Sequence, residues 1–268
     1  MPAPLHIIAL VKWVPDAQLE RSFTDQGLLD RSEGILGELD EYPLEAALQI
    51  KESQKDRDVT VSALTIGPAG ASAAIKKALQ IGADDGFHLN DEALVGSDTW
   101  ATSAAAAAAV QHVRTLNGLQ DAEYLILAGM ASEDGESGAM PAQLAERLNI
   151  PAITQAVDLS FSDSRLTVTR TTALEKQRLA TGLPALVSVT DQANEPRYPN
   201  FRAIMKARKK PTTTFNLADI GLSSSTVGSK VQILFARERP ERSGGTIIHD
   251  EGDAGVQLVD FLQKERLL

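Results

Sequence analysis

A loop of small residues at positions 129–138 is the stretch of this sequence best suited to bind a ligand. It follows an apolar run of strand length at 124–128 and precedes apolar residues at helical spacing, namely Met140, Leu144 and Leu148. The N–H groups and dipole of a helix N-terminus placed there favour an anion, commonly a phosphate. Gly135 and Gly138 let a ligand approach the backbone closely. An ordinary strand-to-helix turn is the alternative, because neither the P-loop pattern nor G-x-G-x-x-G is present.

The start of the following helix carries residues typical of a helix N-terminus. Pro141 suits the first turn, where its missing N–H costs nothing. Asp134 or Ser137 is expected to cap the helix through a side-chain oxygen. The loop thus offers backbone donors for a phosphate but no hydrolytic side chain.

A second segment, residues 194–211, combines a rigid start with a basic continuation. Pro196 and Pro199 make the start an exposed loop. The basic side chains that follow are Arg202, Lys206, Arg208, Lys209 and Lys210. In an acidic chain this cluster fits an acidic partner or a phosphate, although a solvated helix face would have the same composition.

Composition narrows the class of protein. The chain has 268 residues, 43% of them hydrophobic, enough for one sizeable domain or one domain with appendages. A net charge of −10 argues against a general nucleic-acid binder. There is no cysteine, and the four histidines are scattered without metal-ligand spacing. Because no signal peptide or membrane span is visible, a cytoplasmic location is expected.

Predicted strands and helices alternate before Pro151, which indicates a parallel sheet covered on both faces. Strands are expected at 5–11, 59–66, 86–89 and 124–128, and helices at 43–53, 71–79, 98–116 and 139–148. Beyond Pro151, apolar residues alternate across a turn near Asp163 and Ser164, which predicts an antiparallel hairpin, and a strand follows at 184–190. The last part is expected to hold a strand at 231–236, a poorly ordered stretch at 240–252 and an amphipathic helix at 255–267.

Several short motifs, in order over nearly the whole chain, resemble the beta subunit of electron transfer flavoprotein, most closely the actinobacterial type. They are VKWVPD at 11–16, AALQIKE at 46–52, GP at 67–68, ALQIGAD at 78–84, GSD at 96–98, DG at 134–135, GAMP at 138–141, NEPRY at 194–198 and IMKARKK at 204–210. Each motif is weak by itself, and their order and spacing make the resemblance specific.

The resemblance implies a three-layer α/β sandwich with a mainly parallel sheet, of the adenine nucleotide alpha hydrolase-like (Rossmann-like) type, with an antiparallel extension and a C-terminal arm. It places a nucleotide-binding domain in residues 1–228, with a recognition loop at 191–210. Residues 229–268 would form an arm that packs on a partner subunit, whereas an amphipathic helix taken by itself would pack on its own domain.

The resemblance also implies a division of labour between two subunits. The beta subunit pairs with a larger alpha subunit, which holds most of one FAD, and itself binds AMP. The flavoprotein accepts electrons from acyl-CoA or similar dehydrogenases, as in fatty acid beta-oxidation, and passes them to a membrane quinone reductase. The beta subunit would therefore have no catalytic acid, base or nucleophile of its own.

The AMP pocket that the resemblance implies includes the stretch 37–40 and the loop 129–140. Its residues are Leu10, Asp40, Ile66, Gly129, Met130, Asp134, Gly135, Glu136, Ser137, Gly138, Ala139 and Met140. Phosphate would bind the backbone of 135–138 and the Ser137 hydroxyl. The sequence departs from the family in a shorter loop, in GELD at 37–40 in place of an Asn-Pro, and in ALE at 173–175 in place of an acidic, glycine-rich signature.

A loop that docks on the dehydrogenase is implied for Ala193, Asn194, Glu195, Pro196, Arg197 and Tyr198. Ala193 stands where the family carries an anchoring leucine, so binding would depend more on charge and on Tyr198. The alternative is a loop that braces the subunit interface, with Arg197 paired internally.

Three other classes of protein share parts of the pattern, and the sequence argues against two of them. An electron-bifurcating flavoprotein subunit would carry a second FAD in place of AMP. A non-redox nucleotide-binding stress or sensor protein would not need the 194–210 segment. An ATP pyrophosphatase of the same fold would need Ser-Gly-Gly-x-Asp-Ser after the first strand, where this chain has KWVP, and the SGGT at 243–246 lies near the C-terminus.

Overall fold

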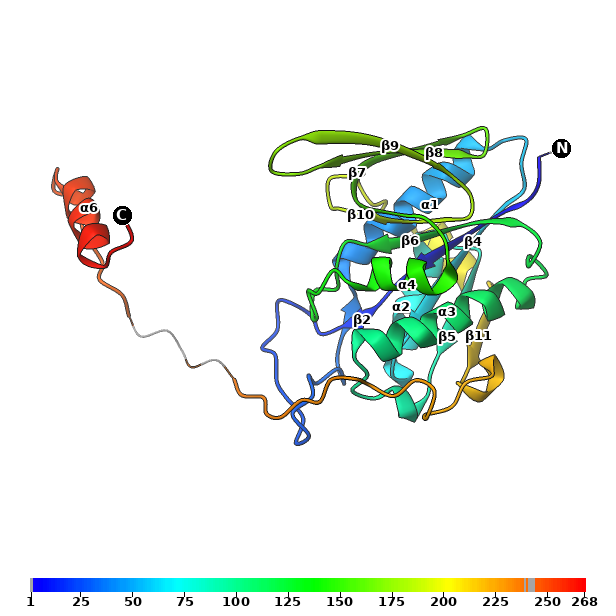
Figure 1. The fold of residues 1–268 in the computed structure, drawn as a ribbon, viewed down its shortest axis with the longest axis horizontal. Helices are drawn as coiled ribbons and strands as arrows, with labels where there is room; N and C mark the ends of the chain where they lie inside the picture. The colour runs from blue at the N-terminus through cyan, green and yellow to red at the C-terminus, as the bar shows by residue number, and fades with distance from the viewer. Residues whose placement is uncertain (1, 239, 241–243) are drawn as a thin grey trace. The chain divides into compact units, whose positions relative to one another are not determined.

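A nine-stranded sheet forms the centre of the computed structural model, which describes residues 2–238, 240 and 244–268 (Figure 1). Its strands follow the order β11-β5-β4-β1-β6-β10-β7-β8-β9. Their bounds are β1 Leu5–Leu10, β4 Val59–Ile66, β5 Asp85–Leu89, β6 Glu123–Gly129, β7 Ala152–Ser162, β8 Arg165–Thr171, β9 Lys176–Gly182, β10 Ala185–Val189 and β11 Thr212–Phe215. A separate pair, β2 (Trp13–Val14) and β3 (Ile35–Leu36), lies in the segment that follows β1.

Pairing is parallel from β11 to β7, and β8 and β9 extend the sheet in antiparallel fashion. The central strand β1 pairs on both sides, with Ile7 opposite Val61 of β4 and Leu125 of β6. Its continuous apolar run is buried because helices cover both faces. The expected mainly parallel sheet with an antiparallel extension is confirmed.

Helices cover both faces of the parallel part of the sheet (Figure 1). The helices α1 (Glu41–Ser53) and α2 (Ser72–Ile81) share a core with Ile7 and alternate residues of the neighbouring strands. The helices α3 (Thr99–Leu116) and α4 (Met140–Leu148) share a second core with Ile8. Because successive strand residues point to opposite faces, the two cores lie on opposite sides of the sheet. This is the three-layer architecture expected from the sequence.

The order in which the chain adds strands to the sheet reverses at β1. From β1 the chain continues to β4 and β5 on one side, and it then returns to β6 on the other side of β1. Ligands of open α/β sheets bind at the carboxyl ends of the strands where the order reverses in this way. The carboxyl ends of β1 and β6 are therefore the expected position of a ligand in this fold.

The short helical pieces are η1 (Glu38–Asp40), η2 (Ala69–Ala71), η3 (Glu92–Leu94) and η4 (Ala218–Ile220), and α5 (Phe201–Ala207) follows the 194–200 loop. The hairpin near Asp163 and Ser164 is confirmed as β7–β8, both turn residues having positive φ. The strands β9 and β11 were not expected from the sequence. No helix among the described residues combines the length and apolar character that crossing a membrane requires.

The prediction of a strand at 231–236 is wrong. The N–H groups of Lys230 and Val231 donate to the Asp98 carboxylate instead, and no regular structure follows up to Ala236. Asp98 also caps α3 through Ala101 N–H, at 2.8 Å. One carboxylate therefore fixes both the start of a helix and the path of the later segment.

Residues 237–268 form a second unit, distinct from the unit that ends at Ala236. Of the stretch 240–252, expected to be poorly ordered, residues 241–243 lie outside the described residues, and the rest has no helix or strand. The amphipathic helix expected at 255–267 is confirmed as α6 (Ala254–Lys264). No residue of α6 is buried, although it carries an apolar set of side chains, namely Val256, Leu258, Val259 and Phe261.

Candidate functional site

The carboxyl ends of three neighbouring strands bring together residues far apart in the sequence. Leu10 ends β1, Ile66 ends β4 and Gly129 ends β6, and β1 lies between the other two strands. Leu10 and Ile66 are half-buried and pack towards the α3–α4 face, whereas Gly129 is buried. The structure thus gathers at one edge the strand-end residues that the sequence assigned to a nucleotide.

Asp40 lies against the ends of these strands, in the η1 turn that leads into α1. It is only 8% exposed, and its Oδ2 accepts the N–H of Lys12 at 2.8 Å. A Cβ on Gly129 would lie 2.8 Å from Asp40 Oδ1 and 2.8 Å from Leu39 O, so the end of β6 needs a glycine for this turn to pack. Burial raises the pKa of Asp40 to about 7, against the opposing effect of Lys12.

Asp134 connects the loop after β6 to the segment after β1. Its fully buried carboxylate accepts hydrogen bonds from Lys12 Nζ at 2.7 Å and from Arg31 Nη2 at 2.6 Å. Burial would raise the pKa of Asp134, but Lys12 and Arg31 outweigh it and lower the pKa to about 2. Asp134 therefore stays ionised, and its carboxylate forms ion pairs with Lys12 and Arg31.

The expected helix cap is not formed. The N-cap position of α4 is Ala139, which has no side-chain cap. Asp134 is turned towards its cation partners, and Ser137 Oγ only reaches Ala139 N–H at 3.4 Å. Pro141 does lie in the first turn of α4, as expected.

The loop 135–140 leaves backbone donors free at the start of α4. Gly135 and Glu136 donate their N–H groups to Ser132, at 3.3 Å and 2.8 Å. Among the described residues, the N–H groups of Ser137, Gly138 and Met140 have no hydrogen-bond partner. Positive φ angles of 47° at Glu136 and 61° at Gly138 turn the chain here. Such N–H groups at a helix N-terminus suit an anionic ligand.

The other residues assigned to the loop frame this turn. Met130, Ala139 and Met140 are half-buried, and Glu136 and Ser137 are exposed. A Cβ on Gly138 would lie 3.5 Å from Met130 O. All the cofactor-binding residues predicted from the sequence therefore lie on the ends of β1, β4 and β6 or on the two segments next to them.

The 193–198 loop faces its own domain more than expected. Ala193 is half-buried against the core, and Asn194 Nδ2 donates to Tyr42 O at 3.0 Å. Arg197 forms ion pairs with Glu45 at 2.7 Å and Glu52 at 2.6 Å, and these carboxylates raise the pKa of Arg197. The internal pairing of Arg197 considered in the sequence analysis is thus present.

Exposed apolar groups in this segment lie further along the chain than Ala193. Tyr198 is 93% exposed, and Phe201, at the start of α5, is 79% exposed. Ala193 is half-buried and lines a hollow next to α1 and β7, and its docking role stays a prediction. The sequence analysis did not single out Phe201. Its position directly after Asn200, a residue type that caps helices, was the available signal, and Asn200 Oδ1 does accept Ala203 N–H at 2.9 Å.

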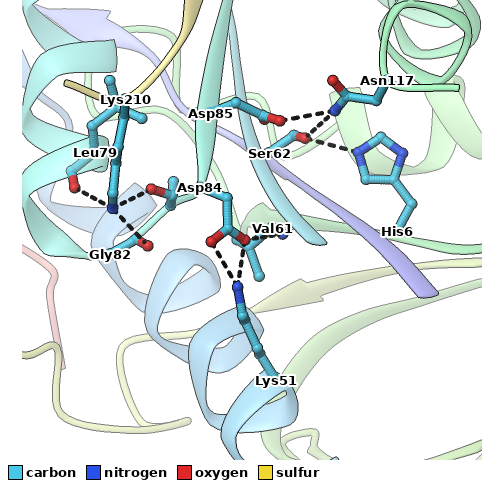
Figure 2. Close-up of polar contacts among 11 residues, drawn as sticks. His6, Lys51, Val61, Ser62, Leu79, Gly82, Asp84, Asp85, Asn117 and Lys210 are labelled. Atoms are coloured by element: carbon cyan, nitrogen blue, oxygen red, sulfur yellow. Dashed lines mark hydrogen bonds and ion pairs between the residues drawn. The ribbon is translucent and has the colours of Figure 1, made fainter. Parts of the chain in front are cut away.

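The basic cluster includes one lysine with a structural role. Figure 2 shows the Lys210 amine among the carbonyl oxygens at the end of α2, with Leu79 O at 2.9 Å and Gly82 O at 3.1 Å. Burial lowers the pKa of Lys210. Nearby, Lys51 Nζ lies 2.6 Å from both Asp84 oxygens. A cation at a helix C-terminus stabilises the carbonyls left without partners.

Two hollows on the first unit lie away from the strand ends. One, of about 220 Å³, is lined by α1, β7, Ala193 and Asn194, and another, of about 410 Å³, lies among Lys51, Arg197 and Lys210. Neither includes the free N–H groups or Asp40. The candidate site is therefore identified by its chemical groups and its position in the fold.

A buried polar cluster lies near the amino ends of β1 and β5 (Figure 2). His6 Nε2 and Ser62 Oγ are 2.8 Å apart, and Asn117 Nδ2 donates to Ser62 at 3.2 Å and to Asp85 at 2.9 Å. Burial and Arg114 lower the pKa of His6 to about 4. No group of three or more His, Cys, Asp or Glu suited to a metal occurs in the described part of the chain.

Comparisons with a family model and with individual proteins agree with one another. The electron transfer flavoprotein domain model matches residues 27–220. The electron transfer flavoprotein subunit beta of Mycobacterium tuberculosis is 38% identical over 98% of this chain and 99% of that protein. The caffeyl-CoA reductase-Etf complex subunit CarD of Acetobacterium woodii is 33% identical over 98% and 100%. The electron transfer flavoprotein subunit beta of Megasphaera elsdenii is 31% identical over 97% of each.

Proposed function

Because this chain belongs to the electron transfer flavoprotein family, with beta subunits as its relatives, we propose that it is the small subunit of a heterodimeric flavoprotein. It is located in the cytoplasm, where it pairs with an alpha subunit and accepts electrons from acyl-CoA or related dehydrogenases. The flavoprotein passes these electrons towards a membrane quinone reductase. The main support for this proposal is the similarity, over 98% of the chain, to an electron transfer flavoprotein subunit beta. The subunit acts as a carrier component and contributes no catalytic residue.

The candidate site binds AMP as a structural ligand in this proposal. The unpartnered N–H groups of Ser137, Gly138 and Met140 suit its phosphate, and they lie at the start of α4. Asp40 and the half-buried Leu10 and Ile66 lie towards the strand ends, where a nucleoside would be enclosed. The residues present therefore fit a nucleotide without a hydrolytic group beside it.

Gly138 offers a direct test of this site. Gly138→Val would add a β-branched side chain at a φ of +61°, beside the free N–H groups. The matched control is Gly118→Val, with a φ of +64° and no atom within 4 Å of its Cβ, distant from the loop in sequence. The expected result is loss of extractable adenine nucleotide in the complex of the Gly138 variant alone. Equal nucleotide content in both variants would remove the loop from the site.

FAD, shared with and mostly held by the alpha subunit, supplies the electron-carrying chemistry when bound. The chain itself has no dinucleotide fingerprint. The C-terminal arm supports the two-subunit arrangement, because α6 buries none of its residues in its own unit. An amphipathic helix of this kind needs an apolar surface to cover its face. We expect that surface on the alpha subunit.

Docking of a dehydrogenase is assigned to the 193–198 loop, with Tyr198 as its exposed aromatic group. Arg197, held by Glu45 and Glu52, fixes the loop rather than contacting the partner. Tyr198→Ala should slow electron transfer from the dehydrogenase while flavin content stays unchanged. A matched control is Leu174→Ala, an exposed apolar residue outside this loop. Unaltered transfer with Tyr198→Ala would leave the loop a structural role only.

A second candidate is a flavoprotein subunit that holds a second FAD in place of AMP. Its support is the 33% identity to a subunit named for a caffeyl-CoA reductase-Etf complex. Co-purification with the alpha subunit, followed by acid extraction, separates the two candidates. One FAD with AMP supports the structural AMP site, and two FAD without AMP supports the second candidate.

A further inference from the structure

Asn117 lies at the end of α3 and is the one asparagine of the chain that precedes a glycine. The next residue, Gly118, is exposed and has a φ of +64°, and a Cβ added to it would have no atom within 4 Å. Because Gly118 has no side chain, its backbone nitrogen is open to approach from the Asn117 side chain. The pair therefore has the covalent arrangement from which an asparagine can lose its amide group spontaneously.

The reaction needs these two residues and water. The backbone nitrogen of Gly118, after losing its proton to the solvent, attacks Cγ of Asn117. A bond between this nitrogen and Cγ forms, the Cγ–Nδ2 bond breaks, and Nδ2 leaves as ammonia with a proton taken from water. Water then opens the resulting imide ring at either of its carbonyl carbons. The product at position 117 is aspartate or isoaspartate.

The fold holds both reacting groups in other contacts. Figure 2 shows the Asn117 amide directed at Ser62 and Asp85, to which Nδ2 donates at 3.2 Å and 2.9 Å. The N–H of Gly118 donates to Thr115 O at 3.0 Å. Ring closure therefore requires the last turn of α3 to open and the amide to leave its two side-chain partners.

We propose that Asn117 is a site of spontaneous deamidation in the folded protein and that its contacts with Ser62 and Asp85 set the rate of the reaction. Hydrogen bonds at the end of a helix open more readily than those of the core, so the reaction proceeds from local opening and does not need global unfolding. The polar cluster lies near the amino ends of β1 and β5, and the nucleotide site was assigned to the opposite ends of the strands. This inference therefore does not rest on the proposed function.

Deamidation converts a donor of the polar cluster into an acceptor. A carboxylate at position 117 cannot donate to Ser62 or Asp85, and it places a second negative charge next to Asp85. Asp85 is only 8% exposed, and burial already raises its pKa, against the hydrogen bonds from Ser62 and Asn117. The product therefore weakens the contact of the end of α3 with β4 and β5, which carry Ser62 and Asp85.

The first test follows the wild-type full chain over time in the folded state. The protein is incubated at pH 8 and digested under mildly acidic conditions, and mass spectrometry of the separated peptides quantifies the exchange of amide for acid. Asn149 is the internal control, because it is exposed and also ends a helix, but the β-branched Ile150 follows it and hinders the attack. Asn117 should react severalfold faster than Asn149. Equal rates at the two positions would overturn the site.

Two serine variants test whether the polar cluster sets the rate. Ser62→Ala removes one partner of the Asn117 amide. The control Ser188→Ala removes an equally buried serine of β10, whose Oγ accepts the N–H of Gln155 at 3.1 Å. Loss of one hydrogen bond should raise the rate at Asn117 roughly two- to tenfold in Ser62→Ala, and Ser188→Ala should react like the wild type. The same rate in all three proteins, or the same increase in both variants, would overturn the role of the cluster.

The effect of the product is measured with Asn117→Asp, which reproduces one of the two products. In urea unfolding of the full chain, Asn117→Asp should unfold at a lower urea concentration than the wild type. The control Asn149→Asp, at an exposed helix end, should unfold close to the wild-type concentration. Equal midpoints for Asn117→Asp and the wild type would overturn the inferred loss of the contacts with Ser62 and Asp85.

Discussion

Replacing Asp134 by asparagine tests how the segment after β1 is held on the candidate loop. The change keeps the shape of the side chain and removes its charge, which approximates the protonated acid. Lys12 and Arg31 then face a neutral amide in place of the carboxylate that they contact at 2.7 Å and 2.6 Å. The folded state should lose stability because two cations lose their counter-charge.

The magnitude can be derived from the pKa of Asp134. A decrease from 3.8 to about 2 corresponds to roughly 2.4 kcal/mol between the ionised and protonated forms. Lys12 and Arg31 are 37% and 33% exposed in their side chains, so solvent weakens both ion pairs. We therefore expect the free energy of unfolding of Asp134→Asn to be about 1–2 kcal/mol lower at pH 7.

The pH dependence gives the sign of the effect. A carboxyl group with a lowered pKa stabilises the fold above its unfolded pKa, and this contribution is lost as the pH falls through its folded pKa. The gap between wild type and Asp134→Asn should therefore be complete at pH 7 and close between about pH 4 and pH 2. Urea unfolding of the full chain over this range measures the gap, with Asp56→Asn as the control, an exposed carboxylate.

A local consequence accompanies the loss of stability. Arg31 holds the 15–34 segment on Asp134, and Trp13 Nε1 donates to Arg31 O at 3.0 Å. With the ion pair weakened, trypsin should cut faster after the exposed Arg21 in Asp134→Asn than in Asp56→Asn. A variant with wild-type stability at pH 7 and unchanged cleavage at Arg21 would refute the role assigned to Asp134.

Three further predictions concern stability measured by urea unfolding of the full chain. Gly129→Ala should lower the free energy of unfolding by about 1–3 kcal/mol, because its Cβ would lie 2.8 Å from Leu39 O. The control Gly182→Ala, whose Cβ would have no atom within 4 Å, should leave stability unchanged, and equal effects of the two variants would contradict the packing of η1 on β6. The free energy of unfolding of Asp40→Asn minus that of the wild type should be about 1–3 kcal/mol larger at pH 8 than at pH 5, because the raised pKa of about 7 makes the ionised form unfavourable in the fold. A difference that does not change with pH would contradict the raised pKa. As the pH falls from 7 to 5, the free energy of unfolding of the wild type should decrease by about 2 kcal/mol more than that of His6→Gln, because the pKa of His6 falls from 6.5 to about 4 on folding. The same pH dependence of stability in both proteins would contradict this prediction.

The parallel part of the sheet could be predicted because its strands are buried on both faces. Continuous apolar runs such as LHIIAL in β1 leave little doubt about a central strand, and glycines and prolines separate them from the helices. The edge strands β9 and β11 escaped prediction because they are exposed and polar. In β9 every second residue is solvent-exposed, and β11 reads Thr-Thr-Thr-Phe. Their existence depends on pairing with a neighbouring strand.

The candidate site was predictable in its position and less so in its details. The glycine-rich loop and helix start indicated where free N–H groups would lie. The sequence could not show that Asp134 pairs with Lys12 and Arg31 rather than capping α4, because the partners are 122 and 103 residues away. Nor could it show that Ala193 packs partly against the core, and its docking role stays a prediction. Both contacts depend on tertiary structure, which local sequence patterns do not encode.

The nucleotide content of the purified complex tests the central claim most directly. The chain is co-expressed with its partner subunit, the complex is isolated, and acid-released nucleotides are separated and quantified together with the flavin absorbance spectrum. The account predicts one AMP and one FAD per heterodimer, and a flavin that the cognate dehydrogenase reduces. A complex that contains flavin but no adenine nucleotide other than FAD would contradict the site at the ends of β1, β4 and β6.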